Sequence, residues 1–133
     1  MILMTSELQL ELITPTAVAL SKQVESVVIP GIEGDMEIFK DHIALITFLR
    51  PGKIIAKDTA GSDTFFSTGG VVEFSNNKLN LLVQDLYQNS QFDGEELKKI
   101  KEDAEQKITS KDLSDRDAYL LNTTIEQINN LKS

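Results

Sequence analysis

One histidine is the only candidate for an imidazole base in this sequence. His42 is the single histidine among 133 residues, Asp41 precedes it, and cysteine is absent. A Ser-His-Asp hydrolase would need the carboxylate to orient the ring, but neighbouring residues of a strand point to opposite faces. No Gly-x-Ser-x-Gly nucleophile turn occurs either. We expect His42 to pack or to meet a partner, and a small His-dependent hydrolase is the least favoured alternative.

Two further features could bind a ligand. An acidic stretch with a central glycine suggests calcium, but it lacks the Asp-x-Asp-x-Asp-Gly order and the distal Glu of an EF-hand loop; its acidic residues are Glu33, Asp35, Glu37 and Asp41. The Gly69-Gly70 pair has no following Lys-Ser/Thr, so it predicts a tight turn and not a phosphate loop. We expect no metal and no cofactor. A stand-alone sandwich that binds a metal or another ligand stays open as an alternative.

Composition limits the partners. The chain has 13 basic and 21 acidic residues, a formal net charge of -8, which has the wrong sign for binding nucleic acid. The longest apolar stretch is 43–49, whereas a membrane helix needs about 20 residues. Residues 1–4 have no basic region before them and predict no secretory signal. We therefore expect a protein that neither spans a membrane nor binds nucleic acid.

The pattern up to about residue 86 is typical of short strands. Leu8, Leu10 and Leu12 alternate with polar residues, as in a strand with one buried face. Further runs follow at 21–29, 36–39, 44–49, 53–57, 64–67, 71–75 and 79–83, separated by Gly, Pro and Asn turns. Many short strands without intervening helices predict an antiparallel sandwich or barrel.

After residue 91 the apolar period becomes helical. Ser114, followed by Asp117, predicts the start of a second helix after a connector at 109–113. The apolar stripes predicted to dock this hairpin are Leu97, Ile100, Ala104 and Ile108 on the first helix and Ala118, Leu121, Ile125 and Ile128 on the second. The second helix has weak helix formers, such as Thr124, expected at or near its solvent face.

The two patterns predict two domains, a β-sandwich over residues 1–90 and a helical hairpin over residues 91–133. A hairpin this small cannot bury both stripes by itself, so it must dock on something. We expect it to be less stable than the sandwich and its docking to be reversible.

Several motifs, in order along the chain, carry a resemblance to a known family. The run 24–38, continuing through His42 to Arg50-Pro51-Gly52, resembles the signature stretch of the epsilon subunit of F-type ATP synthases, called delta in mitochondria. Thr14-Pro15 is similar to the family's opening turn, 66–74 to its Gly-Gly hairpin, and 81–86 to its last strand. The resemblance covers essentially the whole chain.

The resemblance implies a fold and a role. The fold is a flattened β-sandwich of about ten antiparallel strands followed by an α-helical hairpin. The role is that of a non-catalytic rotor subunit in the central stalk of a proton- or sodium-translocating enzyme, coupling the γ subunit to the c-ring. It also implies a position peripheral to the membrane. The membrane could be bacterial or that of an organelle, and the lack of a transit peptide favours the cytoplasmic face of a bacterial inner membrane.

The resemblance further implies contact residues. The predicted c-ring contact is the loop Gly31, Ile32, Glu33, Gly34, Asp35 and Met36, with the two carboxylates facing basic and polar c-ring loops. The predicted γ contact is His42, Leu45, Ile46 and Thr47. The apolar side chains of this second set supply the buried contacts that a torque-transmitting joint needs.

The chain also departs from the family pattern. The family commonly has Pro-Gly-His-Ala-Pro around its histidine, but 40–44 is Lys-Asp-His-Ile-Ala, so the turn before the γ-facing strand is expected to be reshaped. Some members bind ATP through Ile-Asp-x-x-Arg-Ala on the first helix, but residues 100–105 are Ile-Lys-Glu-Asp-Ala-Glu. Since the Asp and Arg are missing at the matching positions, we expect no nucleotide binding.

The last helix bears on regulation. In the family, basic residues of this helix can contact an acidic segment of the catalytic beta subunit and inhibit hydrolysis. Residues 113–133 offer two basic side chains against three acidic ones: Arg116 and Lys132, against Asp115, Asp117 and Glu126. We expect only weak inhibition through a contact between the hairpin and the beta subunit.

Overall fold

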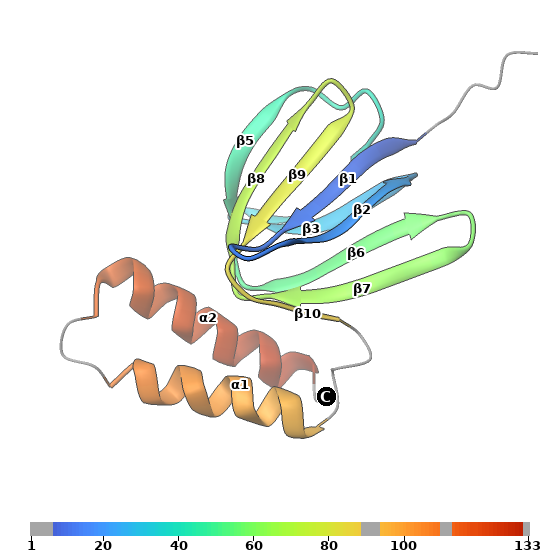
Figure 1. Ribbon diagram of the computed structural model, residues 1–133. Helices are drawn as coiled ribbons and strands as arrows, with labels where there is room; N and C mark the ends of the chain where they lie inside the picture. Colours follow the sequence, from blue (N-terminus) through green and yellow to red (C-terminus); the bar gives the residue numbers. More distant parts are fainter. Residues whose placement is uncertain (1–6, 89–93, 110–112, 132–133) are drawn as a thin grey trace, which may run out of the picture.

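The computed structural model describes residues 7–88, 94–109 and 113–131, with the side chains of 94–97 and 130–131 left out. These ranges hold ten strands followed by two helices (Figure 1). The strands are β1 Leu8–Ile13, β2 Val18–Val24, β3 Ser26–Gly31, β4 Gly34–Phe39, β5 Leu45–Leu49, β6 Gly52–Asp58, β7 Gly61–Ser67, β8 Gly70–Ser75, β9 Lys78–Val83 and β10 Leu86–Gln88; the helices are α1 Gly94–Lys107 and α2 Asp115–Leu131.

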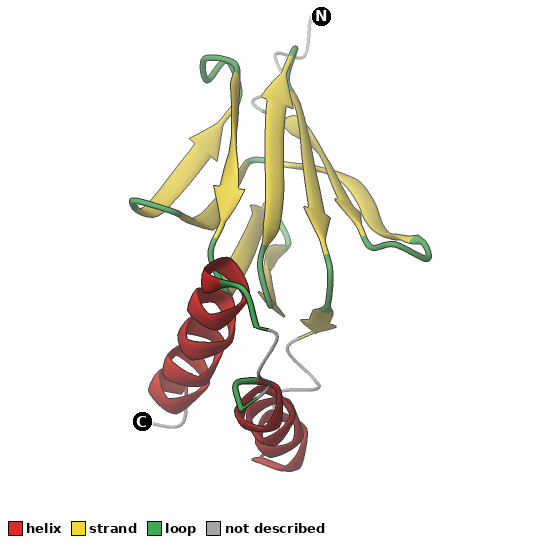
Figure 2. Cartoon of the chain, turned by 90° about the vertical axis from the view of Figure 1, so that its left-hand side faces the viewer, coloured by secondary structure: helices red, strands yellow, loops and turns green. Residues whose placement is uncertain are grey.

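The strands form one continuous sheet that folds over into two layers (Figures 1 and 2). Its order is β10-β7-β6-β3-β5-β8-β9-β1-β2, and β4 pairs with β3 off this path. The two layers join at β3, which pairs with β6 over its first half and with β5 only between Gly31 and Leu49. The expected sandwich is confirmed, but its strands are not all antiparallel, because β1 and β9 run parallel.

The core lies between the two layers and follows the alternation of the strands. Leu8, Leu10 and Leu12 point inward and are completely or almost completely buried. They pack with inward residues of the other strands in one cluster that includes Ile29, Ile38, Ile54, Phe65, Val72, Phe74, Leu79 and Leu81. This alternation is why the period of two in the sequence predicted the buried face correctly.

The run expected at 21–29 is wrong as a single strand. Its residues belong to β2 and β3, which are separated at Glu25. β2 pairs with β1 in one layer, whereas β3 pairs with β4 and β6 in the other. The Glu25 amide donates to the Lys57 carbonyl at 2.8 Å as the chain passes between the layers. Both strands are rich in β-branched and apolar residues, so their composition does not reveal this crossing.

An ionic contact joins the edges of the two layers. The Lys22 ammonium on β2 donates to the Asp58 carboxylate at 2.9 Å and to the Asp63 carboxylate at 2.7 Å. These bonds, led by the one to Asp63, raise the pKa of Lys22 above its ordinary value. The bond from Lys22, followed by one from the Ala60 amide, lowers the pKa of Asp58.

The helices form a hairpin that lies across one end of the sandwich (Figure 1). The Ser114 hydroxyl accepts a bond from the Asp117 amide at 3.1 Å, so the predicted helix start is present. Two details differ from expectation. α1 ends at Lys107, which leaves Ile108 just beyond it, and Thr124 is buried, its hydroxyl donating to the Leu120 carbonyl at 2.8 Å.

Candidate functional site

The predicted c-ring loop is the tight turn between β3 and β4. Gly31 and Gly34 are paired across it, and Ile32 and Glu33 form its tip. Gly34 has a φ of 140°, a conformation that favours glycine. The tip residues Ile32 and Glu33 are exposed, as are Gly34 and Asp35, whereas Gly31 is buried and Met36 is half-buried.

Arg50 braces this turn from the end of β5. Its backbone amide donates to the Pro30 carbonyl at 2.9 Å, and its Nε donates to the Gly31 carbonyl at 3.0 Å. Its Nη2 forms an ion pair with Asp35. Three bonds from one residue to both arms of the turn hold its shape. Arg50 lies in the stretch that resembles the family signature, but no local pattern there predicts this role.

The two carboxylates of the turn are therefore not equivalent. Asp35 has a basic partner within the chain, whereas Glu33 has no ion-pair partner among the described residues. A carboxylate without an internal partner is the more available one for an external cation. We expect Glu33 to attract a positively charged partner more strongly than Asp35 does.

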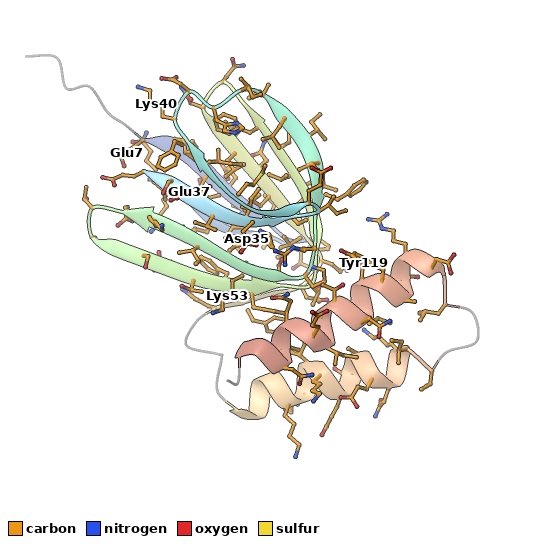
Figure 3. All side chains as sticks on the ribbon, turned by 180° about the vertical axis from the view of Figure 1, so that it is seen from behind. Glu7, Asp35, Glu37, Lys40, Lys53 and Tyr119 are labelled. Atoms are coloured by element: carbon orange, nitrogen blue, oxygen red, sulfur yellow. The ribbon has the colours of Figure 1, made fainter. Side chains whose placement is uncertain are left out.

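Glu37 of β4 bonds to side chains of β3 and β6. Its carboxylate accepts from the Ser26 hydroxyl at 2.8 Å and from the Lys57 ammonium at 3.1 Å, and these bonds, the Ser26 bond first, lower the pKa of Glu37. Along β4, Asp35 lies toward the helices, and Lys40 marks the opposite end of the sandwich (Figure 3). The acidic turn and the turn that leads to His42 therefore lie at opposite ends of this strand.

The turn of residues 40–41 directly precedes His42, the first of the predicted γ-contact residues. Asp41 has a φ of 67°, a left-handed conformation. Its amide donates to Asn77 Oδ1 at 2.6 Å, and Asn77 Nδ2 donates to Asp41 Oδ1 at 3.1 Å. The Asp41 carboxylate thus accepts from an amide on the β8–β9 turn, which argues against a role in orienting the histidine ring.

His42 packs against the sandwich. Its ring meets the edge of Phe74 with 6.0 Å between ring centroids, and Nδ1 lies 2.8 Å from the Ile43 carbonyl oxygen. His42 is half-buried. These contacts fit the expected packing role better than a catalytic one.

β5 presents an apolar outer face. Ile46 is 77% exposed and Phe48 is 49% exposed, while Leu45 and Thr47 are half-buried on the inward side. Of the predicted γ-contact residues, Ile46 is thus the one that points fully outward. Phe48, which the sequence-based prediction left out, lies on the same face, because residues two apart share a face.

The apolar outer face continues across the layer. The residues in register with one another from strand to strand are Phe48, Val71, Leu82, Ile13 and Val18, on β5, β8, β9, β1 and β2. Leu82 is 45% exposed and Val18 is 57% exposed. Val71 and Ile13 between them are half-buried, so the row is apolar throughout and exposed at three of its five positions. Exposed apolar area of this kind is typical of a surface that meets another protein.

Part of the predicted docking set of the hairpin, Ile100, Ala104, Leu121 and Ile128, lies where the helices face the sandwich. Ile100, Ala104 and Ile128 are buried, and Ile108, Ala118, Leu121 and Ile125 are half-buried. Ile100 and Ile128 form a cluster with Phe66 of β7, and Tyr87 of β10 packs against it. The side chain of Leu97 lies outside the described residues. A second contact places the Arg116 guanidinium 5.0 Å from the centroid of the Phe48 ring.

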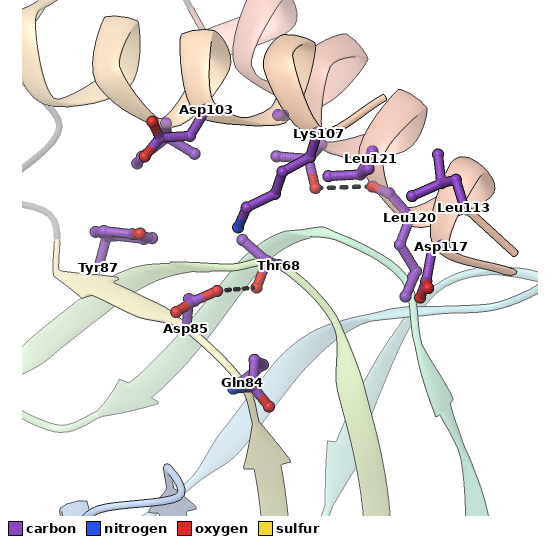
Figure 4. A pocket seen from close by; sticks show the side chains of 13 residues that line it. Thr68, Gln84, Asp85, Tyr87, Asp103, Lys107, Leu113, Asp117, Leu120 and Leu121 are labelled. Atoms are coloured by element: carbon purple, nitrogen blue, oxygen red, sulfur yellow. Dashed lines mark hydrogen bonds between the residues drawn. The ribbon is translucent and has the colours of Figure 1, made fainter. Parts of the chain in front are cut away.

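A crevice of about 510 Å³ separates the helices from the sandwich beside this junction (Figure 4). Its sandwich wall includes Thr68, whose hydroxyl donates to Asp85 at 3.1 Å, and its helical wall includes Asp103, Lys107 and Asp117. Lys107 extends from α1 toward the Thr68–Asp85 pair (Figure 4). The helical wall thus presents two carboxylates and one ammonium.

Within the described residues, no group of three or more His, Cys, Asp or Glu side chains is placed to hold a metal ion. No helix in the described ranges is long and apolar enough to cross a membrane.

Comparison with known proteins gives the family. Residues 7–89 match the family model described as ATP synthase, Delta/Epsilon chain, beta-sandwich domain. The ATP synthase epsilon chain of Pelagibacter ubique (strain HTCC1062) is 34% identical over 129 residues, which cover 96% of this chain and 99% of the relative. A relative from Propionigenium modestum, named ATP synthase epsilon chain, sodium ion specific, is 30% identical over 118 residues, covering 80% of this chain and 86% of its own.

Solved structures agree on the fold. A chain of the Euglena gracilis mitochondrial ATP synthase has a TM-score of 0.74 at 20% identity, over 96% of this chain and 81% of that one. A chain from the central stalk and c-ring structure of the Tetrahymena thermophila mitochondrial ATP synthase has a TM-score of 0.66 at 20% identity, over 94% of this chain and 96% of that one. The chain therefore belongs to the ATP synthase delta/epsilon family.

Proposed function

We propose that this chain joins the γ subunit to the c-ring through two surfaces, the outer face of β5 and the β3–β4 turn. The chain is a non-catalytic rotor subunit of the ATP synthase central stalk. Its task is to transmit torque, which requires surfaces that fix its partners and not a reacting group. The observation that carries the proposal is that one sheet presents two outward surfaces, the apolar outer face of β5 and the acidic β3–β4 turn.

The γ surface is supported by the exposure of β5. Ile46 and Phe48 leave apolar area in water that a partner would cover, at about 25 cal/mol per Å² removed from water. The row across β8, β9, β1 and β2 extends the same face. A continuous sheet surface is suited to a joint that must not slip, because pairing from strand to strand holds β5, β8, β9, β1 and β2 in register.

The c-ring surface is supported by the charge and bracing of the turn. Arg50 holds both arms of the turn, while Glu33 stands exposed at its tip. Charge complementarity with basic c-ring loops would set register and speed of association more than affinity. The half-exposed Ile32 beside Glu33 adds an apolar contact.

The γ surface is tested by adding a charge to it. Ile46→Glu should weaken binding to the γ subunit by at least tenfold, since a carboxylate would be buried without a partner. Ala60→Glu is the matched control, because Ala60 is exposed in the β6–β7 turn at the far side of the sandwich (Figure 1). Calorimetric titration of each chain with γ gives the affinities. Wild-type affinity for Ile46→Glu would refute the γ surface.

The c-ring surface is tested by reversing a charge. Glu33→Lys should slow association with assembled c-ring and remove part of its salt dependence. Glu25→Lys is the control, because Glu25 precedes β3 at the end of the strand away from the turn. Surface plasmon resonance at several salt concentrations compares the two. If both variants associate like the wild type at low salt, the turn is not the contact.

We further propose a position at the cytoplasmic face of a bacterial inner membrane, and only weak inhibition by the hairpin. Arg116, one of two basic residues in 113–133, already lies over Phe48 when the hairpin is docked. Deletion of residues 91–133 should change ATP hydrolysis by the assembled complex little. A large rise in hydrolysis would contradict the weak inhibition.

A further inference from the structure

The turn of residues 40–41 is held in an unfavourable backbone conformation. A φ of 67° at Asp41 is uncommon for residues other than glycine, although Asp adopts it more readily than most. Such a conformation persists only where surrounding contacts fix it. The contacts here are the two reciprocal bonds with Asn77, at 2.6 and 3.1 Å, which join residues 36 positions apart.

Asn77 is itself anchored. Its carbonyl accepts from the Gln9 amide of β1 at 2.9 Å, and it sits with Asn76 in the two-residue β8–β9 turn. Both asparagines have positive φ, 59° for Asn77 and 51° for Asn76, as tight hairpin turns require. Only the side chain of Asn77 reaches Asp41, so one amide ties the 40–41 turn to the fixed layer of β8, β9 and β1.

The segment downstream of Asp41 depends on this tie. The His42 amide donates to the Phe39 carbonyl at 3.2 Å, closing the turn, and the ring then meets Phe74. Ile43 is 79% exposed, so its side chain has little packing to direct it before β5 begins. A change of φ at Asp41 would redirect His42 and Ile43 together.

We propose that Asn77 is a positioning residue that holds the segment from His42 to Ala44, just before β5, in the geometry in which it meets the γ subunit. This rests on the proposed function, since it names what prepares the γ surface. Without the Asn77 amide, Asp41 relaxes toward negative φ and the segment samples several directions. Only the fraction in the competent geometry binds, so the apparent affinity falls by that fraction.

The test removes the amide without adding strain. Asn77→Gly keeps the positive φ of the β8–β9 turn and deletes the bonds to Asp41. It should weaken γ binding about tenfold. Asn76→Gly is the matched control, because it makes the same change in the same turn without touching Asp41, and it should bind γ like the wild type.

Rescue separates positioning from general stability. Asp41→Gly lowers the cost of the positive φ at position 41, so the double variant Asp41→Gly/Asn77→Gly should recover part of the affinity that Asn77→Gly loses. Amide exchange at residues 41–44 of the free chain should speed up in Asn77→Gly and not in Asn76→Gly. Thermal midpoints should be alike for the two asparagine variants.

The outcomes are distinguishable. Equal γ affinity for Asn77→Gly and Asn76→Gly, or no recovery in the double variant, overturns the positioning role while the γ surface stands. If the wild-type chain fails to bind γ, the proposed function itself fails, and the positioning role with it.

Discussion

The contact between hairpin and sandwich should depend on one fully buried side chain. Ile128 of α2 is 0% exposed and packs with Ile100 of α1 and Phe66 of β7. It therefore links both helices to the sheet. Ile128→Ala removes three carbons from this cluster and leaves a cavity that the helices fill only in part.

The free energy lost in Ile128→Ala follows from the burial of Ile128. Truncating a fully buried isoleucine to alanine costs about 2–5 kcal/mol, and the better helix propensity of alanine returns only about 0.4 kcal/mol. The loss cannot exceed the free energy that docks the hairpin, because the sandwich core lies in a separate cluster. With a cost of about 3 kcal/mol, the population of undocked hairpin rises roughly a hundredfold.

Amide hydrogen exchange measures this directly. Protection in α1 and α2 should fall by roughly the same hundredfold factor, while β1, β8 and β9 keep theirs. Asn129→Ala is the control, since Asn129 is the exposed neighbour of Ile128. Equal loss of protection in helices and strands would refute the two-domain division, and unchanged exchange would refute the role of the cluster.

The remaining predictions concern the sandwich itself. Lys22→Met should lower the thermal midpoint at pH 7, whereas Lys78→Met, at an exposed position on β9, should not. Because Asp58 has a folded pKa below its unfolded value of 3.8, its contribution is present above that pH and is lost as the pH falls through the folded value, so melts at lower pH should show a shrinking difference between Lys22→Met and wild type. Gly70→Ala should unfold the chain or lower its denaturant midpoint sharply, because the new Cβ would lie 2.0 Å from a backbone oxygen of β9; a midpoint near that of the wild type would contradict this geometry.

Local patterns predicted the parts of the fold that local physics determines. The alternation at 8–12 identified the buried face of β1, and Ser114 identified the start of α2. Each of these two signals depends on residues that are close together in the sequence. The parallel pairing of β1 with β9 depends instead on how the layers close, and no short pattern encodes that.

Side-chain bonds explain the other differences. Thr124 is polar and was expected near solvent, but its hydroxyl is satisfied by the carbonyl four residues earlier, so it can lie on the buried face of α2. Asn77 was predicted as a turn residue, which it is, but its partner Asp41 lies 36 residues away. The bracing of the acidic turn by Arg50 is hidden in the same way, because it spans 15 residues to Asp35.

β5 contributes to the core, to the proposed γ surface and to the second contact with the hairpin. Its inward residue Leu49 belongs to the core, its outward Ile46 belongs to the proposed γ surface, and Phe48 on the same outward face lies under Arg116 of α2. When α2 leaves, Phe48 loses the Arg116 guanidinium and the pocket that it lines with Tyr119 and Leu120 opens, so the exposed apolar area next to Ile46 grows. We therefore expect undocking of the hairpin to leave γ affinity unchanged or higher. Undocking of the hairpin would then not weaken the joint that carries torque.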